Sequence, residues 1–325
     1  MAQLDAQLGI VDESTYGTAV TVTRFFEYNS EGIEEAEGRT EGNPLRAGYT
    51  ARNDRFTPYF MGASGTVEMD VLTKGFGIWL KHMLGTVATT GPAETTVYTH
   101  TGTMADLFGK FFTLQVNRPF HPAGTNQAFT YSGGKVTSWT LSNSVDGNLV
   151  LSLDLDFSTV STGVALATAS YPTGMEPLAW TKGLVTIGGS NYDVTEFSVT
   201  CNNNLDVDRR FIRNNTDKKE PTGGKREVEF SLSADFDSLT QRNRAHASTR
   251  AAALAAITAT WEGPTLLGST LYPSLQVSIP ASRFDAWAGA MADDAGIKQE
   301  LSGVGTYDGT NSPVSIVYKS ADSTA

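Results

Sequence analysis

The sequence predicts a mainly β protein made of two tandem sandwich- or barrel-like units, each with one short flanking α-helix. Three observations support this fold class: the composition, an alternation of apolar and polar residues, and an internal repetition. The 325 residues are 40% apolar, which is enough for a sizeable core. Only 18% are charged, and Gly, Ser, Thr and Asn are abundant, which favours many short strands joined by turns.

Several segments alternate with a period of two residues, which is typical of half-buried strands. The clearest are residues 149–157, 67–71 and 227–233. Each of them has one apolar face and one face of acidic or hydroxyl side chains. A sheet that is wetted on one side is normally antiparallel, so we expect antiparallel pairing.

Helical patterns are scarce. Residues 72–84 carry apolar side chains at helical spacing and end before Gly85, a suitable residue for a helix terminus. A second short helix is predicted within residues 235–244. The alanine-rich residues 249–260 are ambiguous, because their composition favours a helix whereas their place in the repetition favours a strand.

Three pairs of segments match in the same order along the chain, which indicates a duplicated unit. The repetition predicts a first unit at residues 1–160 with an N-terminal arm, a linker at 161–182, and a second unit at 183–325 with a C-terminal arm. The matched pairs are 28–36 with 196–204, 67–71 with 228–232, and the strands of Trp139 and 149–153 with those of Trp287 and 297–301.

The sequence contains no recognisable catalytic constellation. The four histidines are scattered without partners at metal-ligand spacing, and no phosphate-binding loop or nucleophile elbow is present. The single cysteine, Cys201, excludes an internal disulfide and is expected to be buried. We therefore expect no enzyme activity, no metal, no cofactor and no membrane span.

The formal net charge of −11 argues against a surface that holds nucleic acid, because such surfaces neutralise phosphates with Lys and Arg. It does not exclude a surface that nucleic acid passes without being bound.

Two long segments between predicted strands mix basic, acidic and aromatic residues, which suits contacts between proteins better than a phosphate track. Loops of this length are uncommon without a function, although a solvated loop remains the alternative. Their cations are Arg39, Arg46, Arg52 and Arg55 in the first segment and Arg209, Arg210, Arg213, Lys218 and Lys219 in the second.

An ordered series of motifs resembles the tail tube proteins of long-tailed phages and prophages of actinobacteria. The motifs are residues 12–20 (DESTYGTAV), 24–28 (RFFEY), 74–85 (KGFGIWLKHMLG), 129–139 (FTYSGGKVTSW) and 216–221 (TDKKEP).

This resemblance implies two packed sheets with a flanking helix, a fold shared with the type VI secretion tube protein. It also implies rings whose inner sheets join into one barrel, stacked into a tube that conducts DNA during ejection. The commonest members carry one unit and form hexamers, so a duplicated chain would close as a trimer with pseudo-sixfold symmetry.

The implied location is the virion tail, after synthesis in the host bacterial cytoplasm. The implied partners are further copies of the chain and the tail terminator, tape measure and distal tail proteins, with DNA passing without specific binding. The alternative is a β-sandwich decoration protein or host-binding adhesin of a phage.

Within this interpretation the two long segments would contact the adjacent ring. The polar strand positions would line the channel, where an acidic wall repels DNA. The predicted wall residues are Glu68, Asp70, Asp154, Asp156, Glu227 and Glu229.

Overall fold

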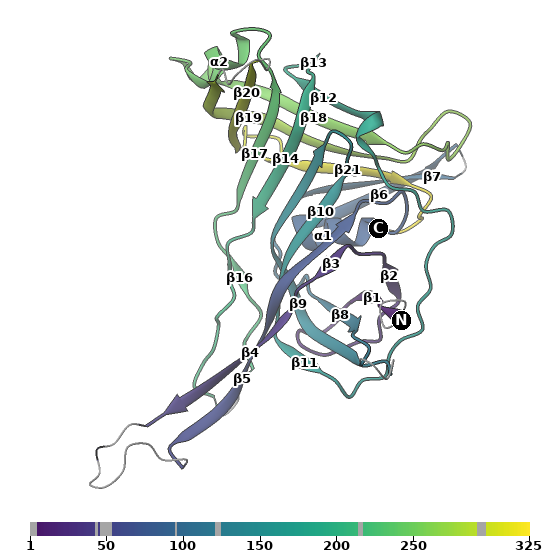
Figure 1. Ribbon diagram of the computed structural model, residues 1–325, viewed down its shortest axis with the longest axis vertical. Helices are drawn as coiled ribbons and strands as arrows, with labels where there is room; N and C mark the ends of the chain where they lie inside the picture. Colours follow the sequence, from purple (N-terminus) through teal and green to yellow (C-terminus); the bar gives the residue numbers. More distant parts are fainter. Residues whose placement is uncertain are drawn as a thin grey trace.

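The computed structural model describes residues 5–42, 45, 54–94, 96–120, 125–213, 217–290 and 297–325. It is mainly β, as the sequence predicts, and the molecule is elongated (Figure 1). One sheet runs through both halves of the chain and carries a smaller layer of strands near each end.

The central sheet, called the long sheet below, is antiparallel throughout and eight positions wide. Strands β3 and β4 share one edge position, because both pair with β5. The order across the sheet is β3 (Ser30–Glu31) with β4 (Glu34–Glu41), β5 (Phe56–Asp70), β10 (Val150–Phe157), β9 (Ala128–Ser144), β14 (Val194–Asn202), β17 (Glu227–Asp235), β20 (Lys298–Gly305) and β19 (Ser274–Ala290).

Strands β9 and β19 are long enough to leave this sheet and enter a second layer (Figure 1). The first half of β9 pairs with β8 and β11, and the first half of β19 pairs with β18 and β21. The first layer contains β11 (Thr159–Ser161), β8 (Phe112–Asn117), β1 (Leu8–Asp12) and β2 (Arg24–Phe26). The second contains β13 (Ser190–Asn191), β12 (Gly183–Ile187), β18 (Leu254–Glu262), β21 (Ser315–Ser320), β7 (Val97–Met104) and β6 (Gly85–Ala93).

The helices are short and lie on the side of the long sheet that the two smaller layers cover. Helix α1 (Gly77–Leu84) ends directly before Gly85, as predicted, and the φ of 104° at Gly85 is favourable only for glycine. It begins later than residue 72, because Gly75 also has a positive φ, of 84°. Helix α2 (Thr240–Ala245) is likewise shorter than predicted, because β17 continues to Asp235.

The ambiguous alanine-rich segment is mainly a strand. Only α3 (Arg250–Ala253) is helical, and β18 begins at Leu254. A 3₁₀ helix of one turn, η2 (Trp180–Lys182), precedes β12. Alternating burial along β18 explains why the strand prevails: Ile257, Ala259 and Trp261 are buried on one face.

One hydrophobic core extends through both halves of the chain. The alternation predicted from the sequence is confirmed, since Leu151 and Leu153 of β10 and Phe230 and Leu232 of β17 are buried. Cys201 is buried, as expected. The largest fully buried side chains include Trp79, Trp139, Trp261, Tyr131 and Tyr318.

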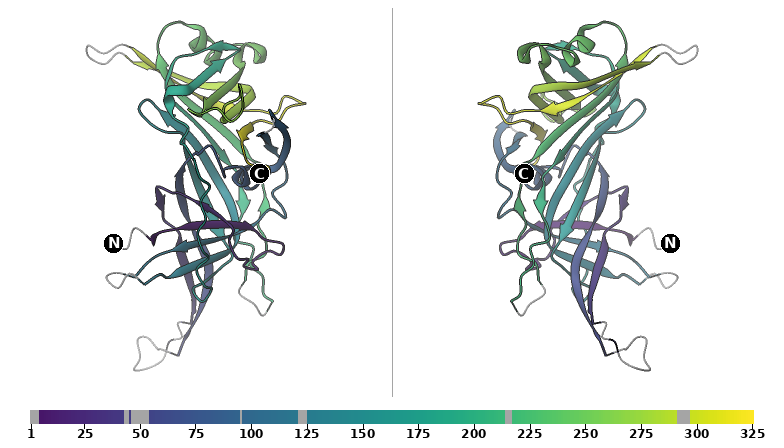
Figure 2. Two further views of the ribbon diagram at one scale, coloured as in Figure 1. Left: turned by 90° about the vertical axis from the view of Figure 1, so that its right-hand side faces the viewer. Right: turned by 90° about the vertical axis from the view of Figure 1, so that its left-hand side faces the viewer.

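The first predicted long loop, residues 34–55, is partly a strand. Strand β4 pairs with the first half of β5 to form a two-stranded ribbon that projects from the body (Figure 1). The second long segment, predicted from the basic residues between 209 and 226, lies within residues 203–226, of which 203–213 and 217–226 are described. It contains one short antiparallel pair, β15 (Leu205–Asp206) with β16 (Thr222–Gly223). Figure 2 shows that both segments lie at the same end of the molecule.

The two halves are hydrogen-bonded to one another, through β9 with β14 and through β7 with β21. Residues 162–182 lie along the surface of the first half, where Gln115 hydrogen-bonds Ala165 and Ala167. The halves therefore share two sheets and one core, and they are not separate globular bodies.

The two halves repeat one strand order. Trp139 pairs with Leu153 in the first half, and Trp287 pairs with Leu301 in the second. Both ladders are interrupted at the same place, beside Asp154 in the first and between Phe284 and Ala286 in the second.

The register differs from the sequence match in two of the three pairs of segments. Leu153 pairs with Val67, whereas Leu301 pairs with Leu232. The position that corresponds to Val67 is therefore Leu232, and not Val228.

Glu31 pairs with Val67 and Phe197 pairs with Leu232, so Glu31 corresponds to Phe197, two residues away from the match of 28–36 with 196–204. Shifts of four and of two residues preserve the alternation of faces, so the sequence pattern could not distinguish these registers.

Candidate assembly surface and channel wall

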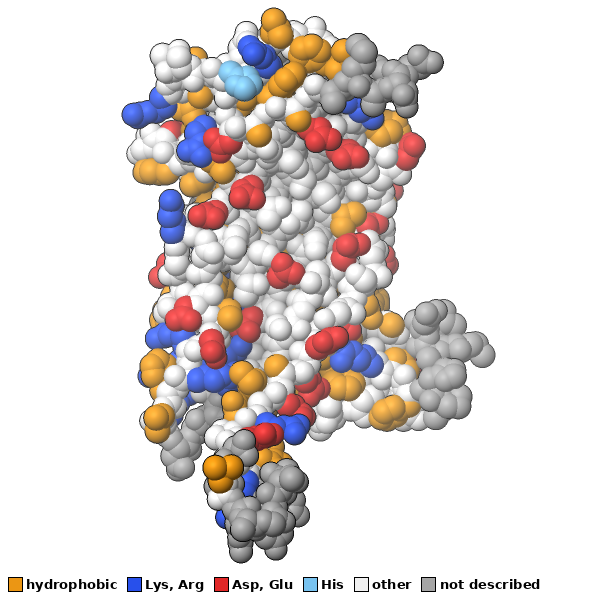
Figure 3. Space-filling model, turned by 60° about the vertical axis from the view of Figure 1, so that its left-hand side comes forward, with side chains coloured by type: hydrophobic (Ala, Val, Ile, Leu, Met, Phe, Trp, Pro, Cys, Tyr) orange, Lys and Arg blue, Asp and Glu red, His pale blue; other side chains and the backbone are white. Residues whose placement is uncertain are grey.

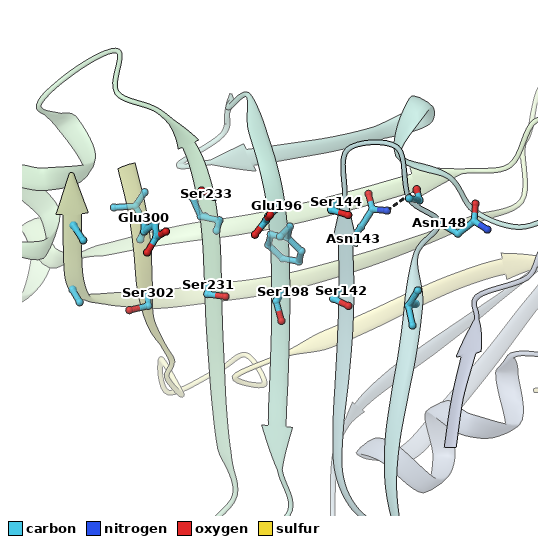
Figure 4. A pocket seen from close by; sticks show the side chains of 17 residues that line it. Ser142, Asn143, Ser144, Asn148, Glu196, Ser198, Ser231, Ser233, Glu300 and Ser302 are labelled. Carbon is cyan, nitrogen blue, oxygen red and sulfur yellow. Dashed lines mark hydrogen bonds between the residues drawn. The ribbon is translucent and has the colours of Figure 1, made fainter. Parts of the chain in front are cut away.

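The long sheet has one broad polar face, on the side opposite to α1. Figure 3 looks onto this face, where acidic side chains are scattered and basic ones gather toward the margins. A shallow hollow of about 680 Å³ lies on it. Two rows of side chains cross four neighbouring strands there (Figure 4): Ser142, Ser198, Ser231 and Ser302 in one, and Ser144, Glu196, Ser233 and Glu300 in the other.

These rows follow from strand geometry. Alternate residues of a strand face the same side, and directly paired residues of adjacent strands share that side. A third row crosses the junction of the halves, where the hydroxyl oxygens of Thr140 and Thr200 are 2.9 Å apart. The result is a surface of short hydroxyl groups and carboxylates, which offers phosphate groups little positive charge.

Five of the six predicted wall residues lie on this face with accessible side chains. Asp154, Glu227 and Glu229 are exposed, and Glu68 and Asp70 are half-buried. Asp70 accepts hydrogen bonds from Asn29 and Asn148 at 2.9 and 2.7 Å. Asp154 accepts hydrogen bonds from Thr66 and Ser138. These donors fix the orientation of the carboxylates on the sheet.

Asp156 is the exception, because it is buried in an ion pair with Lys218. The Lys218 ammonium lies 2.5 and 2.6 Å from the two carboxylate oxygens. Burial lowers the pKa of Lys218 and raises the pKa of Asp156, and each partner's charge opposes the other's shift. Asp156 therefore does not contribute to an acidic surface, and Lys218 is not free to contact another ring.

A second buried ion pair ties down the same segment. The Lys135 ammonium lies 2.5 Å from Glu220 Oε1 and 2.7 Å from the carbonyl oxygen of Leu107. Glu220 Oε1 also accepts a hydrogen bond from the Gly109 amide at 2.6 Å. The part of this segment around Lys218 and Glu220 is thus held against the first half by two lysines that are almost fully buried.

The other predicted contact residues lie at the end of the molecule that carries the ribbon. Arg39 and Arg55 are exposed and close to Glu41 and Asp54, whereas Arg46 and Arg52 lie outside the described residues. The Arg209 and Arg213 guanidinium groups donate to the carbonyl oxygens of Glu220 and Asp217, both at 2.6 Å. Arg210 donates to the Met61 carbonyl oxygen, and the exposed Lys219 lies 5.0 Å from the centre of the Phe211 ring.

Sequence reasoning missed two acidic residues of the polar face, Glu196 and Glu300. Both line the hollow. The available signal was the alternation Glu196, Ser198, Thr200 in β14 and Glu300, Ser302 in β20. It also missed large apolar side chains near the ribbon end: Phe56, Phe108 and Phe211 are 48%, 57% and 51% exposed.

The described ranges contain no group of three or more His, Cys, Asp or Glu side chains that could hold a metal ion. Among the same residues, no helix is long and apolar enough to cross a membrane.

The fold is that of a mainly β protein whose extended antiparallel sheet has an apolar, covered face and a polar, open one. The sequence matches the family of phage tail tube proteins over residues 3–309, so the chain belongs to that family. The resemblance seen in the sequence motifs is thereby confirmed. No curated protein matches the sequence. Membership implies a structural component of the virion tail that self-assembles, with other tail proteins, into a tube.

Proposed function

We propose that this chain assembles into rings, that the rings stack into a tube, and that the polar face of the long sheet lines a channel for DNA ejection. The observation that supports this most strongly is the long sheet itself. It is polar on one face, and among the described residues nothing pairs with the outer side of β3–β4 or of residues 284–290 in β19. Closing such a sheet through further copies would remove both open edges.

The repeated strand order supports a duplicated tube unit. Each half contributes four positions to the long sheet: β3–β4, β5, β10 and β9 in the first, and β14, β17, β20 and β19 in the second. Three chains would supply six such units, so we propose a trimeric ring with pseudo-sixfold symmetry.

The stagger of the strands is compatible with a barrel of this size. The row that starts at Glu68 passes through Thr140 and Thr200 and reaches β17 at Glu229. In the second half, the residue that corresponds to Glu68 is Ser233. The row reaches β17 at Glu229 instead, so it shifts by four residues over the four strand-to-strand steps from β5 to β17. Twenty-four strands with this stagger, spaced about 4.8 Å apart and tilted by about 35°, would enclose a lumen roughly 35 Å wide.

The chemistry of the polar face suits passage of DNA without binding. Its carboxylates repel phosphates, and its hydroxyl groups are short and neutral. Three chains would carry a net charge of −33, three times −11. We assign the wall role to Glu68, Asp70, Asp154, Glu227 and Glu229, together with Glu196 and Glu300. No catalytic step is proposed.

The ribbon and residues 203–226 would contact the adjacent ring. They lie together at one end of the molecule, and exposed aromatic and basic side chains accompany them. Terminal rings would present the same surfaces to the tail terminator and distal tail proteins, and the lumen would hold the tape measure protein before ejection. A decoration protein or adhesin would not need two open edges on one sheet.

Electron microscopy of the purified protein tests this function. We expect tubes or stacked rings, and averaged end-on views should show three chains per ring. A protein that remains monomeric at high concentration would contradict the proposed function. Six chains per ring would contradict the trimer and leave the duplication without its proposed purpose.

A further inference from the structure

We propose that the ring closes in one defined register: the free edge of β19 adds to the β3–β4 edge of the next copy, with Ala288 directly opposite Glu34. This inference rests on the proposed function, since it specifies the contact between neighbouring chains. It is derived from the junction between the two halves of one chain, where β9 pairs with β14.

The two halves place corresponding residues at corresponding positions. Trp139 and Trp287 correspond, because each pairs with the matching leucine of its half. Glu31 and Phe197 correspond in the same way, because they pair with Val67 and Leu232. Counting along the strands, Thr140 corresponds to Ala288 and Thr200 to Glu34.

At the internal junction Thr140 lies directly opposite Thr200. The same geometry between chains places Ala288 opposite Glu34. Ser138 lies opposite Asn202 at the internal junction, and the corresponding pair between chains is Ala286 opposite Ala36. The faces agree with this assignment: Ala286 and Ala288 line the hollow on the polar face of the long sheet, and Glu34 is exposed. The polar face would therefore continue from one chain into the next.

The chemistry of the two edges explains why β19 and β4 would select one another. Strand β4 is acidic, with Glu34, Glu35 and Glu37 all exposed, so two β4 edges would place like charges opposite each other. The free edge of β19 presents small side chains at Ala286 and Ala288 and admits the neighbouring backbone closely. Such a head-to-tail contact between unlike edges produces a ring when the rotation closes.

Disulfide cross-linking tests the register. Directly paired strand residues have Cα atoms close enough for a disulfide, whereas a diagonal pair is about 7 to 8 Å apart and lies outside the usual range. The in-register variants are Glu34→Cys with Ala288→Cys and Ala36→Cys with Ala286→Cys. The off-register variant is Glu34→Cys with Ala286→Cys, on the same face.

The internal junction supplies a matched control. Thr140→Cys with Thr200→Cys should form a disulfide within one chain, because the native hydroxyl oxygens are 2.9 Å apart. After oxidation it should migrate as a monomer on a denaturing gel. The in-register variants should instead give covalent dimers and trimers that disappear on reduction, and each single-cysteine variant should give tubes without this ladder. The native Cys201 is buried and should not contribute.

The outcomes separate the register from the function. A ladder from both in-register pairs, at least tenfold stronger than from the off-register pair, supports the inference. Rings or tubes that cross-link best through the off-register pair, or through none, overturn the register and leave the proposed function standing. Unmodified protein that remains monomeric, with no ladder from any variant, overturns both.

Discussion

The ion pair between Lys218 and Asp156 is the residue-level feature with the clearest consequence for stability. Both side chains are almost entirely shielded from solvent, at 3% and 10% exposure. Lys218→Met leaves the Asp156 carboxylate buried without a partner, which costs about 3 to 5 kcal/mol in comparable cases. We expect a loss of this size in the free energy of unfolding, measured by urea denaturation.

Two controls accompany this prediction. Replacing both partners, with Lys218→Met and Asp156→Leu, removes the uncompensated charge and should cost less than Lys218→Met alone. Lys219→Met alters the exposed neighbour and should change stability by less than about 1 kcal/mol. A single variant at Lys218 that is as stable as the native protein would show that the pair does not hold this segment in place.

The ribbon formed by β4 and the first half of β5 can be shortened at its tip without removing any part of the long sheet that pairs with β10. Glu41 and Phe56 are the last residues of the β4–β5 ladder, followed by a hydrogen bond from the Gly42 amide to the Arg55 carbonyl oxygen, and the ladder residues at this end are exposed. Residues 42–55 can therefore be replaced by Asn-Gly, the residues preferred in a two-residue hairpin turn. We expect a folded protein that forms rings but does not elongate into long tubes.

Electron microscopy and circular dichroism would measure this outcome together. The matched control exchanges residues 308–311, an exposed turn outside the proposed ring contact, for a turn of equal length. Tubes of native length from the shortened ribbon would show that it is not needed for stacking.

For the whole molecule, the distribution of charge on the long sheet predicts how DNA moves through the channel. Glu227→Lys with Glu229→Lys places cations on the proposed wall, where each phosphate contact adds affinity through counterion release. We expect normal tubes but slower DNA ejection, with a larger delay at low salt because screening is weaker there. Virions that carry Glu262→Lys, a change at an exposed residue of β18 outside the long sheet, should eject DNA at the native rate.

An ejection assay with purified virions carrying each variant would measure this effect. Equal rates for the wall variant and the control, at both high and low salt, would contradict the assignment of this face to the lumen.

The sequence by itself determined the fold class, the family and the polar face. Alternation of period two can be read within a single strand, so it identifies five accessible carboxylates of the polar face without any knowledge of how the strands pair. The same periodicity cannot select the register, because shifts by even numbers of residues keep every side chain on its face. Only the tertiary structure therefore assigned Leu232, and not Val228, to the position of Val67.

The tertiary structure alone also decided which charged residues face solvent. Lys218 and Asp156 are 62 residues apart in sequence, and both resemble exposed residues until the segment around Lys218 folds over β10. The sequence pattern did not predict the ribbon for a similar reason. The acidic segment β4 is a strand because it pairs with the extended β5, which lies elsewhere in the sequence. Burial and long-range pairing depend on which segments meet in space, and the pattern within one segment does not contain that information.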